Sequence, residues 1–375
     1  MILRHLSISN YKNILEADFD LSDNVNCFVG KNGMGKTNLL DAIYYLSFCK
    51  SATNLPDSSI VRHGEEYFML EGEYLLHESS ETESEQIKCG YRMRSKKKFS
   101  RSGKDYKRFS DHIGLLPLVM LTPADSVLIS GGSEERRRFM DQAISQFDKS
   151  YLDSLLRYNE ALAARNFALK QDPPIADPAL CRIWEEQMDF YGHQLYEKRR
   201  LFIEQFMPVF EEFYRQISLG RESVSLTYTS HFSKGSLLPL LDEARNRDLA
   251  LGYTTRGAHK DDIQMTIGDN LIKQIGSQGQ NKTFLVTLKL ALFDFLRRMG
   301  HTTPILLLDD IFDRLDGDRV EQIIKLVASN RFGQIFITDT NREYLDRIID
   351  AVSDSYRLFE VCDGTYKVVA EREKS

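Results

Sequence analysis

The segment Gly30–Thr37, which reads GKNGMGKT, constrains this chain of 375 residues more than any other part of it. It matches the phosphate-binding loop pattern, in which two glycines separated by four residues precede a lysine and a hydroxyl residue. The apolar run Val25–Val29 before it predicts a buried strand, and Asn38–Ser47 after it has apolar residues at helical spacing. Strand, loop and helix together predict a nucleotide site. The alternative is an ordinary glycine turn that precedes a helix.

Each residue type in this loop has a chemical reason to be there. Glycines let the backbone fold closely around an anion, so that successive amides and the helix N-terminus point at the β-phosphate. Lys36 is expected to reach the β- and γ-phosphates, and Thr37 is expected to offer its hydroxyl to the Mg²⁺ ion that bridges them. The predicted ATP-binding residues are Gly30, Lys31, Asn32, Gly33, Met34, Gly35, Lys36 and Thr37.

An acidic motif near the C-terminus completes this prediction. Ile305–Leu308 is apolar throughout and is followed by Asp309 and Asp310, which predicts a strand that is buried on both faces and ends in two carboxylates. We expect Asp309 to lie beside Thr37 and to hold Mg²⁺. Asp310 is expected to orient or deprotonate the attacking water, which makes Asp310 and Lys36 the predicted catalytic groups. The alternative is a simple Asp-Asp turn at a strand end.

Composition restricts the class of protein. Hydrophobic residues make up 42% and charged residues 28% of the chain, which is typical of a globular protein and not of a disordered or membrane-embedded one. With a formal net charge of −6, any contact with DNA requires a local basic surface. The five cysteines form no CxxC pair, which favours reduced thiols in a cytoplasmic protein. No segment is long enough to span a bilayer, so we expect no membrane partner.

The order of patterns along the chain predicts an α/β fold with a helical insert. Alternating and apolar runs between Met1 and Leu121 predict strands around the phosphate-loop helix. The stretch Ser133–Ile217 is helical in composition, although prolines between Pro173 and Pro208 interrupt or bend it. Sheet returns with Ser223–Thr229, which alternates again.

The last third of the chain contains further strands. Ile263–Ile267 and Leu271–Ile275 flank a Gly-Asp-Asn turn and predict a hairpin, and Thr283–Met299 predicts a long apolar helix. Gln334–Thr338 predicts a second buried strand, and the alternation of strand and helix predicts parallel pairing with the phosphate-loop strand. We therefore expect an ATPase lobe formed by residues 1–122 and 300–375, interrupted by a mainly helical lobe over residues 123–299.

Two basic segments are candidates for contact with DNA. Arg94–Phe109 contains eight basic residues and one acid, interleaved with aromatic residues, and Arg136–Arg138 is the second segment. The alternative for the first segment is a solvated β-hairpin with its turn at Ser102 and Gly103, because charge runs commonly form solvated faces. The candidate DNA contacts are Lys96, Lys97, Lys98, Arg101, Arg137 and Arg138.

The order of these motifs is that of an ABC-type ATPase head, and the chain resembles the bacterial RecF family of DNA replication and repair proteins over essentially its whole length. The resemblance implies a phosphate-loop ATPase head in which a mixed sheet lobe carries a helical lobe between its two sequence halves. The segments that carry it are Leu3–Asn13, the phosphate loop, Pro123–Asp141, Arg256–Asp262, Gly276–Lys282 and Leu306–Asp316.

The resemblance also implies an ATP-dependent dimer in which two subunits associate head to tail. A signature element would close on the γ-phosphate bound by the other subunit; it consists of Ser277, Gln278, Gly279 and Gln280. Asp316 would lie at the dimer interface. Thr338 stands where ABC transporters have a switch histidine, and its hydroxyl can bond a phosphate or a water. On the residues alone, Ser277 at a helix start predicts either an anion site or a helix cap.

The function implied by the resemblance is ATP-dependent DNA binding in replication and recombinational repair. The dimer would close on duplex DNA near single-strand gaps, irrespective of sequence, and a weak DNA-stimulated hydrolysis would release it. A RecR-type mediator protein would be its partner in recombinase loading and the DNA-damage response.

Two alternatives use the same motifs. A structural head of the chromosome-organising coiled-coil class needs on the order of hundreds of heptad residues, which the prolines from Pro173 to Pro208 prevent. A transport ATPase subunit would carry the switch histidine that Thr338 replaces.

Overall fold

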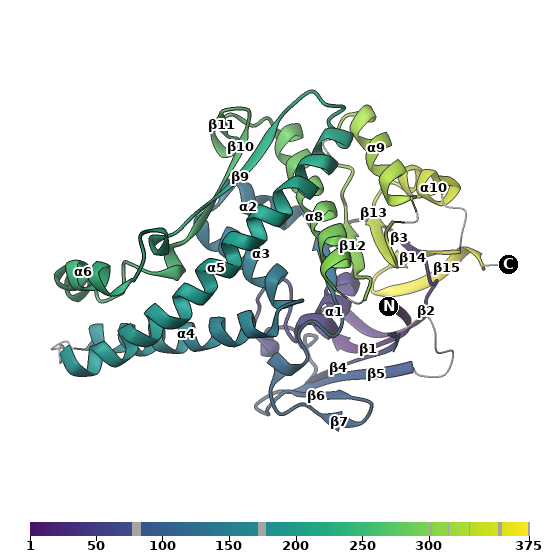
Figure 1. Ribbon diagram of the computed structural model, residues 1–375. Helices are drawn as coiled ribbons and strands as arrows, with labels where there is room; N and C mark the ends of the chain where they lie inside the picture. The colour runs from purple at the N-terminus through teal and green to yellow at the C-terminus, as the bar shows by residue number, and fades with distance from the viewer. Residues whose placement is uncertain are drawn as a thin grey trace. The chain divides into compact units, whose positions relative to one another are not determined.

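The computed structural model describes residues 1–76, 84–171, 178–300, 302–313, 315–329, 331–351 and 355–373. The chain forms two compact units (Figure 1), the first made of Met1–Asp125 and Lys282–Ser375 and the second of Ser126–Asn281. The insert predicted over residues 123–299 therefore ends earlier than expected. Helix α8 (Gln278–Met299) belongs to the first unit from Lys282 onward, and there the ammonium of Lys289 donates to the carbonyl of Met120 at 2.9 Å.

One sheet of the first unit is antiparallel and has the strand order β2-β1-β4-β5-β6-β7. Alternate residues such as Leu6, Ile8 and Leu70 are buried on its inner face, as the period of a strand requires. Ser102 and Gly103 adopt φ angles of 44° and 79° between β6 and β7, which confirms the predicted hairpin turn. The strands are β1 (Ile2–Tyr11), β2 (Ile14–Asp20), β4 (Tyr67–Leu75), β5 (Ser84–Arg92), β6 (Lys98–Arg101) and β7 (Lys104–Asp105).

The other sheet of this unit is mixed and has the order β15-β14-β3-β13-β12-β8. Its strands are β3 (Val25–Val29), β8 (Leu118–Leu121), β12 (Ile305–Asp309), β13 (Ile335–Asp339), β14 (Tyr356–Cys362) and β15 (Thr365–Arg372). β13 pairs in parallel with both β3 and β12, which confirms the predicted parallel arrangement. The carboxyl ends of β3, β13 and β12 consequently meet at one edge of the sheet, where ligands of open α/β sheets bind.

Helix α1 (Lys36–Phe48) packs in a core that both sheets build. Ile43 of this helix is fully buried together with Phe68 and Leu70 of the antiparallel sheet and with Leu307 and Phe336 of the mixed sheet. This burial on both sides of the helix fixes the phosphate loop, which immediately precedes it. The remaining helices of the unit are η1 (Asp57–Ser59), η2 (Phe109–Asp111), α9 (Gly317–Val327) and α10 (Arg342–Ala351); α8 (Gln278–Met299) starts at the unit boundary, and η3 (Pro123–Ser126) crosses the other one.

The second unit is mainly helical, and its helices α4 (Lys149–Leu169) and α5 (Pro178–Ile217) lie side by side (Figure 1). Its small sheet has the order β11-β10-β9. No helix within the described ranges is both long and apolar enough to cross a bilayer. The other elements are α2 (Val127–Ser130), α3 (Ser133–Ser145), β9 (Val224–Thr229), η4 (His231–Lys234), α6 (Leu238–Leu251), η5 (Ala258–Lys260), β10 (Asp262–Ile267), β11 (Asn270–Leu271) and α7 (Ile272–Ile275).

One predicted strand of this unit is wrong. Leu271–Ile275 pairs with β10 only through β11 and then forms the short helix α7, where the amide of Gly276 donates to the carbonyl of Ile272 at 2.8 Å. A short apolar run fits a strand or a helical turn equally well, so its periodicity could not decide between them. Pro208 lies inside α5, which continues to Ile217; Pro173 and Pro174 lie outside the described residues.

Candidate nucleotide-binding site

The loop between β3 and α1 is shaped to surround an anion. Helix α1 has Gly35 as its N-cap residue, and no side chain in the described part of the chain caps it. Amides of an uncapped first turn and the helix dipole together attract anions. Gly33 and Gly35 have φ angles of 83° and 111°. A residue with a side chain would be strained in this backbone conformation. At Gly30, a Cβ would lie only 2.4 Å from the carbonyl oxygen of Val361.

Lys36 does not face solvent in this structure. Its side chain folds back, and Nζ donates to the carbonyls of Gly30 at 2.8 Å and Lys31 at 3.2 Å, which leaves the residue only 4% exposed. To reach the oxygens of a β- or γ-phosphate, the ammonium must exchange these two carbonyls for phosphate. The carbonyls of the loop therefore hold the ammonium of Lys36 in place.

The predicted proximity of Asp309 to Thr37 is present. The hydroxyl of Thr37 donates to Oδ2 of Asp309 at 2.8 Å, although the two residues are 272 positions apart in the chain. Thr338 donates to the other oxygen, Oδ1, at 2.5 Å and is fully buried. One hydroxyl and one oriented carboxylate are a set of hard oxygen donors that fits Mg²⁺, which takes further ligands from phosphates and water. The roles of these residues as metal ligands stay predictions.

Asp310 stands directly after β12 in a left-handed backbone conformation, with φ 45°. Its amide donates to the carbonyl of Thr338 at 3.1 Å. Burial raises the pKa of its carboxyl group; the charge of Lys36 opposes this shift, whereas the carboxylates of Asp309 and Asp339 reinforce it. A carboxylate with a raised pKa is a stronger base for a water proton than an exposed one.

A third carboxylate, Asp339, was missed by the sequence analysis. It ends β13, its Oδ1 accepts from the amide of Asn341 at 2.7 Å, and its carbonyl accepts from the amide of Gly30 at 3.4 Å. Burial also raises the pKa of Asp339. The available signal was its position, since it is the first charged residue after a strand predicted to end beside the phosphate loop.

The C-terminal hairpin of β14 and β15 also contacts the phosphate loop. The hydroxyl of Tyr366 donates to the carbonyl of Gly35 at 3.2 Å, and the amide of Gly364 donates to the carbonyl of Met34 at 3.0 Å. Burial raises the pKa of Tyr366, so this hydroxyl keeps its proton. The Asp-Gly pair at Asp363 and Gly364 was a recognisable hairpin signal, but nothing local could show that its turn contacts this loop.

In the second unit, the predicted signature element forms a helix cap. The hydroxyl of Ser277 accepts from the amide of Gln280 at 3.2 Å, and Oε1 of Gln280 accepts from the amide of Ser277 at 2.8 Å. This reciprocal pair is a capping box. Gln280 also donates to Glu222 at 2.8 Å. In the single chain, Ser277 and Gln280 therefore cap the helix, which was the alternative to an anion site. A role of Ser277, Gln278 and Gly279 at another subunit's phosphate stays a prediction.

Asp316, the predicted interface residue of the first unit, is exposed and caps helix α9. Its Oδ1 accepts from the amide of Arg319 at 2.9 Å, and its Oδ2 lies 3.3 Å from the guanidinium Nε of the same residue. This cap fixes the start of α9, and a contact with a second subunit stays a prediction.

Lys97 is a structural cation and not a free candidate for DNA contact. Its ammonium donates to the hydroxyl of Tyr45 at 2.9 Å and to the carbonyl of Cys49 at 2.7 Å, and it pairs with Asp57 at 3.1 Å. It also lies over the rings of Tyr45 and Phe109 at 5.0 and 5.3 Å. These partners use its hydrogen-bond donors inside the protein.

The arginine candidates are also engaged. Arg101 donates to Glu85 at 2.9 Å through Nε, and Arg138 donates to Glu135 at 3.0 Å. Arg137 is partly buried and donates to the hydroxyl of Ser133 and to the carbonyl of Asp261, both at 2.7 Å. Burial lowers the pKa of Arg137.

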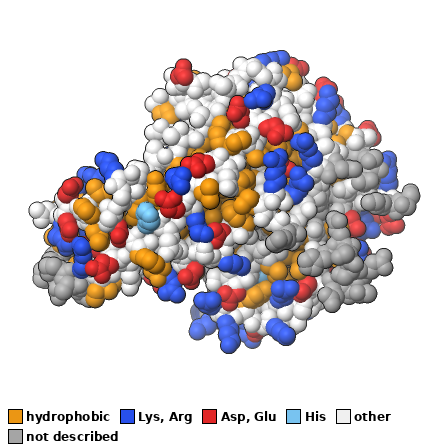
Figure 2. All heavy atoms as spheres, viewed as in Figure 1, with side chains coloured by type: hydrophobic (Ala, Val, Ile, Leu, Met, Phe, Trp, Pro, Cys, Tyr) orange, Lys and Arg blue, Asp and Glu red, His pale blue; other side chains and the backbone are white. Residues whose placement is uncertain are grey.

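Lys96 and Lys98 are the two candidates that lie exposed. Neither forms an ion pair with any residue that the structure describes. Figure 2 shows lysine and arginine side chains gathered over β6 and β7, at the lower edge of the view. Of the six predicted candidates, only Lys96 and Lys98 are exposed, so the basic surface contains fewer of the predicted residues than expected.

Comparisons with known proteins find a matching family model, similar sequences and similar solved structures. The family model described as RecF/RecN/SMC N terminal domain matches residues 2–365. A DNA replication and repair protein RecF of Bacteroides fragilis is 56% identical over 374 residues, which cover all of both chains. A solved structure of the recombination mediator protein RecF with ATP, in the RecFOR pathway, is 28% identical, with a TM-score of 0.86 over 98% of each chain. An Smc head bound to a domain of ScpA is 15% identical with a TM-score of 0.60 over 100% and 98% of the two chains, which shows a shared fold alone.

Proposed function

The chain belongs to the RecF family, and from this premise we propose that it is an ATP-dependent DNA-binding protein of replication and recombinational repair. The observation that carries the proposal is the hydrogen bond of 2.8 Å between Thr37 and Asp309. It joins the phosphate loop to the acidic strand end, so that Thr37 and Asp309 would together hold the Mg²⁺ ion of an ATPase centre.

The ATPase chemistry follows from the residues around this hydrogen bond. Lys36 would exchange its two loop carbonyls for β- and γ-phosphate oxygens, while the amides at the start of α1 bind the β-phosphate. Thr37 and Asp309 would hold Mg²⁺, which neutralises charge on the phosphates when it is bound. Asp310 would accept the proton of the attacking water. Because the signature element of a second subunit would complete this site, we propose a weak hydrolysis that DNA stimulates.

The proposed switch is a dimer that ATP closes and hydrolysis opens. In it, the exposed Ser277 of each subunit approaches the γ-phosphate held by its partner, and Asp316 lies at the interface. A helix N-terminus suits this role because its amides and dipole attract negative charge. Light scattering without nucleotide, with ADP and with ATP, each with and without duplex DNA, tests the switch. A dimer that forms equally in all conditions contradicts it.

Ser277→Arg is expected to keep the chain monomeric in the presence of ATP, because a bulky cation at the signature element blocks closure. ATP binding by the same subunit should remain, and titration calorimetry measures it. The matched control is Ser277→Ala, which removes the cap without adding bulk; it should lower the free energy of unfolding by about 1 kcal/mol and allow dimerisation. A dimer of normal affinity in the arginine variant would show that the element only caps α8.

We propose that Lys96 and Lys98 contact the DNA backbone. The double substitution Lys96→Ala and Lys98→Ala should flatten the slope of log affinity against log salt by about two units, roughly one for each phosphate that is no longer neutralised. Lys97→Ala is the matched control, because its ammonium is bonded inside the protein. It should lower the melting temperature and leave the salt slope unchanged. An unchanged slope in the double variant would remove this surface from the proposal.

Family membership supports the remaining parts of the proposed function. We propose action at single-strand gaps in duplex DNA irrespective of sequence, a RecR-type mediator partner in recombinase loading and the damage response, and a cytoplasmic location. A chromosome-organising head is a weaker proposal, since α4 and α5 have only 21 and 40 residues, far fewer than a long coiled-coil arm needs. Co-purification of the chain with a RecR-type protein, with gapped DNA present or absent, tests the partner.

A further inference from the structure

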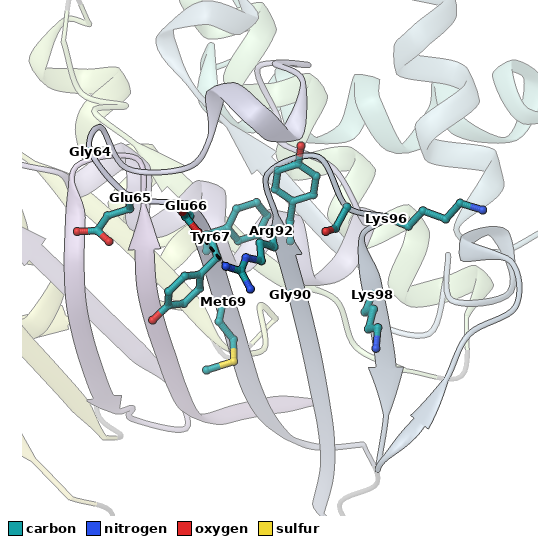
Figure 3. A pocket seen from close by; sticks show the side chains of 12 residues that line it. Gly64, Glu65, Glu66, Tyr67, Met69, Gly90, Arg92, Lys96 and Lys98 are labelled. Carbon is teal, nitrogen blue, oxygen red and sulfur yellow. Dashed lines mark hydrogen bonds and ion pairs between the residues drawn. The ribbon is translucent and has the colours of Figure 1, made fainter.

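The outer face of the antiparallel sheet carries a groove that the nucleotide site does not use. It has a volume of about 700 Å³ and lies over β4, β5 and the start of β6 (Figure 3). Cavities that bind small ligands have volumes of roughly 300–1,000 Å³, so the groove is large enough for one. All of its lining residues belong to the first unit.

Gly90 forms the floor of this groove. In the sheet register it pairs with Met69 of β4 on one side and with Lys98 of β6 on the other, and Figure 3 shows it between these two side chains. Its backbone is not left-handed, and a Cβ at this position would meet no atom within 4 Å. Neither conformation nor packing therefore requires glycine here. Glycine inside a strand often marks a bulge, a tight bend or a place where a ligand approaches the backbone, and the pairing register is regular through Gly90 on both sides.

The two sides of the groove differ in chemistry. Tyr67 and Met69 are 46% and 44% exposed and form an apolar side. The exposed ammonium groups of Lys96 and Lys98 stand on the β6 side. The end near Tyr67 also carries Glu65 and Glu66, but Glu66 pairs with Arg92 at 2.9 Å.

We propose that this groove binds one unpaired nucleotide of single-stranded DNA. The base lies on Tyr67 and Met69 above the bare backbone of Gly90, and the flanking phosphates contact Lys96 and Lys98. Exposed aromatic rings beside lysines are the usual platform for unpaired bases, and a base inside a duplex has no exposed face to offer. The carboxylate of Glu65 at the other end repels phosphates and so favours the backbone on the lysine side of the groove. The inference rests on the proposed function, because it takes DNA as the ligand.

Fluorescence anisotropy with a labelled oligothymidylate and a blunt duplex of equal length tests the groove. Tyr67→Ala should weaken single-strand binding by about 5- to 150-fold, the range for one base stack removed, and leave duplex binding unchanged. Because a Cβ at Gly90 meets no atom within 4 Å, Gly90→Leu should fill the groove, keep the melting temperature and weaken single-strand binding at least about tenfold. Gln86→Leu is the matched control, since Gln86 lies on the same strand and the same exposed face, outside the groove.

A second measurement separates stacking from simple charge attraction. In a Tyr67→Trp variant, oligothymidylate should quench the fluorescence of the new tryptophan, whereas free thymidine monophosphate at equal nucleotide concentration should not. Quenching by the mononucleotide alone would mean a small-molecule site and would overturn the proposal. Wild-type affinity of Gly90→Leu for the single strand would also overturn it, while ATP-dependent duplex binding would still support the proposed function. Conversely, a wild type that lacks ATP-dependent duplex binding but binds oligothymidylate through this groove would refute only the proposed function.

Discussion

Asp310→Asn is expected to reduce ATP hydrolysis by about 100- to 10,000-fold, the usual contribution of a general base, while ATP binding persists. Asparagine keeps the shape of the side chain but cannot accept a proton from the attacking water. Burial raises the pKa of Asp310, so the active carboxylate is present only above this raised value. Turnover of the wild type should therefore fall as the pH decreases through that pKa, and this step should be absent from the residual activity of the variant.

A second variant decides which carboxylate is the base. Asp339 is buried and Asp310 is half-buried. The pKa of Asp339 is also raised, but its Oδ1 already accepts the amide of Asn341 at 2.7 Å. Asp339→Asn should therefore change turnover much less than Asp310→Asn. Single-turnover hydrolysis with excess protein gives the chemical step for both variants. A larger loss in the Asp339 variant would assign the base to β13 and leave Asp310 as a strand-end carboxylate.

If ATP closes the dimer and hydrolysis opens it, Asp310→Asn should also trap the closed form. Light scattering would then find a dimer that persists after ATP is added, whereas the wild type returns to monomer as ATP is consumed. A dimer that persists because the variant binds ATP but does not hydrolyse it would show that the proposed release step depends on hydrolysis at Asp310.

The geometry of the candidate nucleotide site could be predicted from the sequence because its signals are local. A fully apolar run such as Ile305–Leu308 predicts a strand buried on both faces, and the glycine pattern predicts the loop. Parallel pairing then brings Asp309 to Thr37 without further information. The contact of Tyr366 with the same loop could not be predicted, because this residue lies in no pattern with a positional meaning.

The basic surface was only partly predictable, because charge in a sequence does not reveal the partner of each cation. In the run from Lys96 to Lys98, the middle lysine turns inward to Tyr45 and Asp57. Arg136 was part of the second basic segment, yet it forms two hydrogen bonds with Asp262, 126 positions away. Such long-range ion pairs leave no local signal, so a basic run overestimates the surface that can bind phosphate.

Lys36→Met is expected to remove ATP binding and with it every ATP-dependent property. Loss of one partner of a buried, hydrogen-bonded charge pair costs about 2–5 kcal/mol, which corresponds to a decrease in affinity of at least about 30-fold. Methionine has a similar length but no positive charge, so the α- and β-phosphates can still contact the amides of α1 while the γ-phosphate loses its cation. Titration calorimetry with ATP and ADP measures both affinities, and we expect the larger loss for ATP.

The structure adds a second effect to this variant. The ammonium of Lys36 bridges the carbonyls of Gly30 and Lys31, so methionine also removes two hydrogen bonds that hold the loop. A moderate fall in melting temperature without nucleotide is therefore expected, together with loss of the rise that ATP gives to the wild type. Lys104→Met, at an exposed position of β7, is the control and should change neither. Unchanged ATP affinity in Lys36→Met would refute the assignment of the phosphate loop, because the proposed site relies on this ammonium to move onto the γ-phosphate.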